Sequence, residues 1–198
     1  MNNVAAKDYL INRFDDITRE TLLDLEKTQR DFWNISRQTA EFLYTQIILN
    51  NCKNAIEIGT SNGYSGLWLS KALKVTEGKL TTIEYYPKRQ DIAVENFKKC
   101  GTFDIITPVI GDACEILEKI GENEKFDFVF SDANKRQSVE YFKLLDKHII
   151  KGGIFACDNV LSHKEKMQTF IDEINSHPDY ENVILNLPAG LAFARKIR

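Results

Sequence analysis

The chain has 198 residues, of which 43% are hydrophobic and 28% are charged, and its formal net charge is −3. This composition excludes an intrinsically disordered chain and favours one α/β domain spanning residues 1–198. No basic run marks a nucleic-acid footprint, although a weakly acidic balance does not exclude RNA as a substrate. No signal peptide and no apolar stretch of 18 residues is apparent, so we expect a cytoplasmic protein that contacts no membrane.

The cysteines indicate the same compartment. Cys52, Cys100, Cys114 and Cys157 form no C-x-x-C pair, and each lies in or beside an apolar segment. This pattern is typical of free buried thiols in a reducing environment, and it argues against disulfides or a cysteine-bound metal.

The first 50 residues are expected to form a helical cap. Helices are expected at 18–30 and 36–50, and Ser36 suits the N-cap of the second. In that second helix, apolar residues recur with the spacing of one helical face: Ala40, Leu43, Tyr44, Ile47 and Ile48.

From residue 51 onward, short β-branched runs alternate with amphipathic stretches. Strands are expected at 55–58, 80–84, 105–110, 126–131, 154–157, 183–187 and 191–195. Helices are expected at 64–73, 88–100, 113–120, 138–150 and 164–176. This alternation predicts an α/β, Rossmann-like fold in which helices cover both faces of a mostly parallel, seven-stranded sheet. The short loop 188–190 makes the last two strands an antiparallel C-terminal hairpin.

Each of the five expected parallel strands delivers a carboxylate at its end. These residues are Glu57, Glu84, Asp112, Asp132 and Asp158. A helix N-cap explains any one of them, but ligands of such sheets bind at the carboxyl ends of the strands. Five carboxylates at one edge would repel one another, so they require cations or hydroxyl donors nearby.

The turn after the first strand, residues 57–66, is rich in glycine. Gly59 and Gly63 allow backbone to approach a ligand, and the following helix begins there with free N–H groups. A dinucleotide fingerprint would need glycines where Ser61 and Tyr64 stand. A nicotinamide dehydrogenase is therefore disfavoured.

The later strand ends predict a ribose contact and a metal site. Glu84 can accept both hydroxyls of a ribose, with a solvated strand end as the alternative. Asp132, Asp158 and Asn159 are hard oxygen ligands that suit Mg²⁺, Mn²⁺ or Ca²⁺, although the last two alone would also fit a turn. Lys135 follows Asp132 by three residues and is either a solvated loop residue or a base near the metal.

These motifs resemble the cation-dependent O-methyltransferases, a family that includes caffeoyl-coenzyme A and catechol O-methyltransferases and many small bacterial members. The resemblance covers about residues 36–198 and is carried, in order, by AIEIGTSNGYSGLWLSKAL, LTTIEYYP, FDFVFSDANK, GGIFACDNVL and LPAGLAFARK. It implies a class I methyltransferase fold, S-adenosylmethionine (SAM) as cofactor and a divalent cation, with Mg²⁺ favoured over Mn²⁺ or Ca²⁺. It also suggests a homodimer.

The resemblance implies a role for each matching residue. Those expected to bind the cofactor are Glu57, Gly59, Gly63, Tyr64, Ser65, Glu84, Asp112, Ala113 and Asp132. Among them, Tyr64 is expected near the methyl donor, Glu84 on the ribose, and Asp112 and Ala113 beside the adenine. Those expected to ligate the metal are Asp132, Asp158 and Asn159, and those expected to act in catalysis are Lys135 and Asp132.

Three features bear on the acceptor pocket. Asn134 stands where relatives commonly have Asp or Trp, and Ala189 stands where many bacterial relatives have Asp. The sequence leaves open whether either departure alters acceptor binding. The aromatic residues Phe32, Trp33 and Tyr44 either cover the site or pack between the N-terminal helices.

The expected function is SAM-dependent, metal-dependent O-methylation of a catechol-like or phenolic small molecule. Methylation of a 5-hydroxyuridine in tRNA by the same chemistry is the alternative within the family. A non-catalytic SAM-binding protein is a third possibility, but the retained Asp132, Lys135, Asp158 and Asn159 argue against it.

Overall fold

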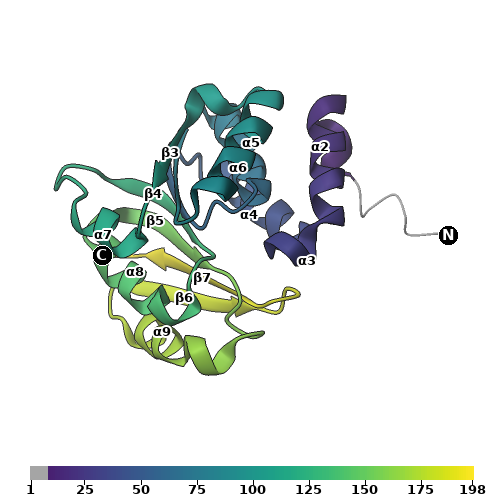
Figure 1. The fold of residues 1–198 in the computed structure, drawn as a ribbon. Coiled ribbons are helices and arrows are strands. Elements are labelled where there is room, and N and C mark those ends of the chain that lie inside the picture. Colours follow the sequence, from purple (N-terminus) through teal and green to yellow (C-terminus); the bar gives the residue numbers. More distant parts are fainter. Residues whose placement is uncertain (1–8) are drawn as a thin grey trace.

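The computed structural model describes residues 9–198 (Figure 1). Residues 1–8, which belong to the stretch expected to lack a signal peptide, lie outside the described residues. Seven strands form one sheet in the order β3-β2-β1-β4-β5-β7-β6. Their bounds are β1 (Asn54–Ile58), β2 (Lys79–Glu84), β3 (Ile106–Ile110), β4 (Phe126–Ser131), β5 (Ile149–Cys157), β6 (Tyr180–Leu185) and β7 (Leu191–Lys196).

The strand pairing confirms the predicted fold class. Strands β1 to β5 pair in parallel, whereas β7 pairs antiparallel with both β5 and β6. The hairpin turn closes where Gly190 N–H donates to Leu187 O at 2.8 Å. The carboxyl ends of β1 to β5 therefore meet at one edge of the sheet, where the predicted site residues follow them.

Helices cover both faces of the sheet (Figure 1). One face packs against α4 (Arg37–Leu49), α5 (Tyr64–Thr76) and α6 (Pro87–Lys99), and the other against α7 (Ala113–Glu118), α8 (Ser138–Asp146) and α9 (Lys164–Ser176). Successive residues of β4 alternate between these two cores, with Phe128 in the first and Val129 in the second. Short 3₁₀ turns lie at Ile11–Arg13, Phe103–Ile105 and Lys135–Gln137. No helix within residues 9–198 is long and apolar enough to cross a membrane.

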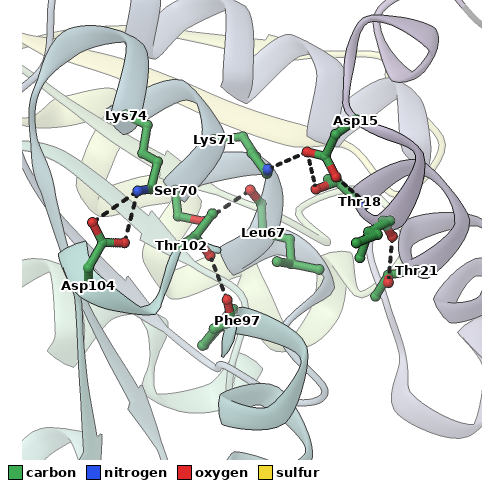
Figure 2. A network of polar contacts seen from close by, with 11 residues as sticks. Asp15, Thr18, Thr21, Leu67, Ser70, Lys71, Lys74, Phe97, Thr102 and Asp104 are labelled. Carbon is green, nitrogen blue, oxygen red and sulfur yellow. Dashed lines mark hydrogen bonds and ion pairs between the residues drawn. The ribbon is translucent and has the colours of Figure 1, made fainter. Parts of the chain in front are cut away.

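Two short helices, α2 (Asp16–Lys27) and α3 (Gln29–Phe32), form the N-terminal cap beside α5. Asp15 caps α2 by accepting from Thr18 N–H, and Lys71 of α5 donates to the same carboxylate at 2.9 Å (Figure 2). Tyr44 packs between helices, because its ring lies 6.0 Å from the ring of Trp68. Of the two alternatives for Tyr44, covering the site or packing between helices, the structure confirms the second.

Several element bounds differ from those predicted. The helix expected at 18–30 ends at Lys27 and is followed by α3 as a separate turn. The helix expected at 138–150 ends at Asp146, because Ile149 pairs with Phe126 and begins β5. The strand expected at 183–187 begins instead at Tyr180, which pairs with Lys196. In the last two cases a strand-pairing partner distant in sequence overrides the local apolar pattern.

Candidate active site

A cavity of about 540 Å³ lies at the carboxyl ends of β1 to β4. This volume falls in the range of roughly 300–1,000 Å³ that is typical of small-molecule sites. Its walls come from the segments that follow these strands and from residues 32–35 of the N-terminal cap. The predicted residues that line it are Gly59, Ser65, Glu84, Asp112, Ala113, Asp132 and Lys135.

Gly59 sets the distance between the ends of β1 and β4. Its φ is +103°, and a Cβ added there would lie 2.5 Å from the backbone oxygen of Asp132. The N–H of Asp132 donates to Ile58 O at 2.9 Å, which holds the two strand ends together. Only glycine fits both the conformation and the space. The close approach seen here joins two strand ends, and the expected approach of the backbone to a ligand stays a prediction.

Glu84 joins two loops at the cavity wall. It is 5% exposed, and it accepts from Ser61 N–H at 2.8 Å and from Tyr86 N–H at 2.9 Å, with one carboxylate oxygen for each. Each oxygen keeps a second lone pair, so the carboxylate can still accept hydroxyls from a ligand. The geometry is compatible with the predicted ribose contact.

Glu57 lies beneath the glycine turn and outside the cavity lining. It is fully buried and accepts from Ser65 Oγ at 2.5 Å and from Thr82 Oγ1 at 2.6 Å. Burial raises the pKa of its carboxyl to about 7. Gly63, with φ +86°, caps α5 against Phe97 and also lies outside the lining.

The raised pKa of Glu57 predicts a stability component that depends on pH. The unfolded chain loses this proton near pH 4.5 and the folded chain near pH 7, so the contribution is complete below pH 4.5 and is lost as the pH rises to 7. We expect the unfolding free energy of the wild type, measured relative to Glu57→Gln, to fall by about 3 kcal/mol across this window. Urea unfolding at a series of pH values measures it, and a difference independent of pH would contradict the assignment.

Tyr64 does not face the cavity. The prediction placed it near the methyl donor, but its ring is 1% exposed and its hydroxyl donates to Glu26 Oε1 of α2 at 2.8 Å. The correction has a simple cause: Tyr64 is the first residue of α5, and its side chain points toward the cap while the next residue, Ser65, reaches the cavity.

The predicted metal ligands follow adjacent strands. Ser131 and Cys157 are partners in the pairing of β4 with β5, so Asp132 and Asp158 leave the sheet side by side. Lys135 Nζ donates to Asp132 Oδ1 at 2.7 Å, and Asn159 Nδ2 donates to Asp158 Oδ2 at 3.0 Å. Asp158 is 2% exposed, and its Oδ1 has no hydrogen-bond partner.

The electrostatics of this pair favour a positive charge. Burial, followed by the charge of Asp132, raises the pKa of Asp158 to about 8, and burial also raises the pKa of Asp132. Residues 9–198 contain no group of three or more His, Cys, Asp and Glu side chains placed to hold a metal. The predicted set has two carboxylates and the amide of Asn159, and its unpaired buried oxygen fits a hard divalent cation.

The remaining predicted residues lie at or near the cavity. Asp112 caps α7 by accepting from Cys114 N–H at 2.9 Å, and it lines the cavity with Ala113. Asp132 and Lys135 line the cavity, whereas Asp158 and Asn159 lie behind its wall. The structure thus places the predicted metal ligands beside the cavity.

Phe32 and Trp33, for which covering the site was one of two alternatives, line the cavity, and so does Asn134. The lining residues with no predicted role are Asn34, Ile35, Ile58, Thr60, Ser61, Ile83, Tyr85, Tyr86, Arg89, Gly111, Ala133, Gln137 and Tyr141. Tyr85 and Tyr86 follow Glu84 directly, so the same strand-end rule extends to them. Arg89 stacks on the rings of Trp33 at 4.8 Å and Tyr86 at 5.3 Å, an arrangement with no sequence signal because Trp33 is distant in the chain.

Comparison with known proteins identifies the family. Residues 12–197 match the model of the O-methyltransferase family. The chain belongs to this family. An O-methyltransferase from Eucalyptus gunnii that acts on caffeoyl-CoA is 34% identical over 87% of this chain and 79% of its own. The catechol O-methyltransferase of Mycobacterium tuberculosis is 31% identical over 64% of this chain. The chain spans 57% of the length of this enzyme and 58% of that of the catechol O-methyltransferase of Niastella koreensis.

Solved members of the O-methyltransferase family share the fold. The O-methyltransferase of Bacillus cereus, solved in complex with S-adenosylhomocysteine (SAH), is 25% identical, with a TM-score of 0.82 over 97% of each chain. TomG of Streptomyces achromogenes, solved with SAM, has a TM-score of 0.82 over 98% of this chain and 96% of its own. At 22% identity the likeness to TomG shows the fold alone.

Proposed function

We propose that this O-methyltransferase family member transfers the methyl group of SAM to a hydroxyl of a catechol-like or phenolic small molecule. We further propose that its site takes a divalent cation, for which Mg²⁺ is best suited. The observation that carries the proposal is Asp158 Oδ1, a buried carboxylate oxygen without a partner, beside Asp132 at the edge of the cavity. An isolated buried carboxylate oxygen is costly, and a cation relieves that cost.

The cavity supports the SAM half of the proposal. The Gly59 turn brings backbone to one wall, Glu84 offers lone pairs for ribose hydroxyls, and Asp112 and Ala113 border the far end. This order along the strand ends follows the extended shape of a nucleoside linked to an amino acid. The O-methyltransferase of Bacillus cereus, which was solved with SAH, supports the same assignment.

The proposed reaction converts a hydroxyl and a sulfonium into an ether, SAH and a proton. A divalent cation held by Asp132, Asp158 and Asn159 would supply positive charge that favours the ionised hydroxyl. Lys135 Nζ, which donates to Asp132 Oδ1, would donate to the oxyanion as an ammonium, and it would receive the hydroxyl proton only after it had lost a proton of its own. Aligning the oxygen with the methyl carbon and sulfur can lower the barrier by about 7–11 kcal/mol. Phe32 and Trp33 of the cap line the cavity and would limit the entry of water.

Radiolabelled methyl transfer from SAM tests this function. Transfer to a catechol is expected to disappear in EDTA and to return with excess Mg²⁺. Full activity in the chelator would remove the metal from the proposal. A parallel reaction with bulk tRNA separates the two candidate acceptors. Transfer of label to RNA but not to catechols would mean that the acceptor is a hydroxylated uridine and not a small molecule.

A further inference from the structure

Two of the segments that line the cavity are far apart in sequence. They are residues 32–35 of the cap and the turn between β1 and α5. A molecule bound in the cavity is retained only while these two segments keep their relative position. The contacts that set this relative position therefore bear on how tightly the cofactor is held.

Two hydrogen bonds join the turn directly to the cap. Ser61 Oγ donates to Phe32 O at 2.9 Å, at the cavity itself. Tyr64 Oη donates to Glu26 Oε1 at 2.8 Å, three residues further along the chain. Both donors belong to the glycine turn or the first residue of α5, so the cap is fixed to the part of the core that faces the cofactor.

Glu26 connects three helices. Its carboxylate, in the last turn of α2, accepts from Tyr64 of α5 and from Arg37 of α4, whose Nε and Nη2 lie 2.8 Å and 2.5 Å from its two oxygens. The Glu26 and Arg37 side chains are 25% and 21% exposed, so the bidentate pair is largely shielded from water. Burial, and then the charge of Glu26, raise the pKa of Tyr64, which keeps its hydroxyl a donor.

We propose that Tyr64 and Glu26 are positioning residues for cofactor binding, which hold the cap wall at residues 32–35 over the cofactor turn and so slow cofactor release. The inference rests on the SAM half of the proposed function and needs neither the metal nor the acceptor. It gives Tyr64 a role different from the direct cofactor contact expected from sequence.

A second tie between the same two elements provides a matched control. Lys71 Nζ of α5 lies 2.9 Å from Asp15 Oδ2 at the start of α2 (Figure 2). Lys71 lies seven residues after Tyr64, about two helical turns further from the cavity. A variant at Lys71 therefore weakens the attachment of the cap without touching the wall of the cavity.

The test compares SAH binding by wild type, Tyr64→Phe and Lys71→Gln, with calorimetry for affinity and stopped-flow fluorescence for release. Trp33 lines the cavity and is 72% exposed, so its emission reports occupancy, while Trp68 is fully buried. Tyr64→Phe keeps the ring and removes only the hydroxyl. We expect it to release SAH about tenfold faster, because a hydrogen bond to a charged group is lost. Lys71→Gln is expected to stay within about twofold of wild type.

The outcomes separate the two proposals. Absence of SAH binding by the wild type would contradict the proposed function itself. If SAH binds the wild type and leaves Tyr64→Phe at the same rate, or if Lys71→Gln releases it equally fast, the positioning role is overturned. Should Tyr64→Phe not fold, Glu26→Gln decides: release at least threefold faster supports the role, and unchanged release overturns it.

Discussion

Asp158→Ala is expected to lower kcat/KM for catechol methylation by about 10³-fold, because the loss of a cation costs several kcal/mol of transition-state stabilisation. Asp158 is buried behind the cavity wall and does not line the proposed cofactor space. SAH affinity is therefore expected to stay within a fewfold of wild type. Methyl-transfer kinetics and SAH calorimetry on the same preparations measure both quantities.

Asp104→Ala is the matched control for this substitution. Asp104 is an exposed carboxylate paired with Lys74 (Figure 2), and neither residue lines the cavity. Its removal should leave both methyl transfer and SAH binding unchanged. If Asp158→Ala keeps more than about a tenth of wild-type activity, or loses SAH binding in parallel with activity, the role given to Asp158 is wrong.

Gly59→Ala is expected to abolish detectable SAH binding and to lower the unfolding free energy by about 2–4 kcal/mol. The added methyl group would lie 2.5 Å from the Asp132 oxygen, in a backbone conformation with φ +103° that side chains rarely adopt. The turn must move off the end of β4, which displaces both the cofactor wall and Asp132. Urea unfolding and calorimetry with SAH test the two effects.

Gly101→Ala isolates the backbone component of that change. Gly101 also has positive φ, +65°, but nothing lies within 4 Å of an added Cβ. We expect a cost of only about 1 kcal/mol there and normal SAH binding. Wild-type SAH affinity in Gly59→Ala would show that the turn does not form the cofactor wall.

The sheet was predictable because its signals are local. Each parallel strand is a short β-branched run followed by a helix, and the hairpin is marked by a loop too short to hold one. The predicted bounds of helices and strands were wrong where strand-pairing partners distant in sequence decide them. Ile149 and Ile150 resemble the end of a helix, yet Ile149 pairs with Phe126 and both residues belong to β5.

The site was predictable only in part, and for the same reason. The strand-end rule placed Glu84, Asp132 and Asp158 at one edge, and the structure groups them there. It could not show that Tyr64 turns away, because that depends on the position of Glu26 in a cap helix. Nor could it decide whether Trp33 covers the site or packs between helices, since this residue adopts φ +55° at the end of α3, a conformation that the local sequence pattern does not predict.

Titration with Mn²⁺, followed by electron paramagnetic resonance, tests most directly whether the strand ends hold a cation. Wild type is expected to bind one Mn²⁺ per chain, to exchange it for Mg²⁺, and to lose this binding in Asp158→Ala but not in Asp104→Ala. Wild type that binds no Mn²⁺, or Asp158→Ala that binds it as tightly, would contradict the proposed metal site.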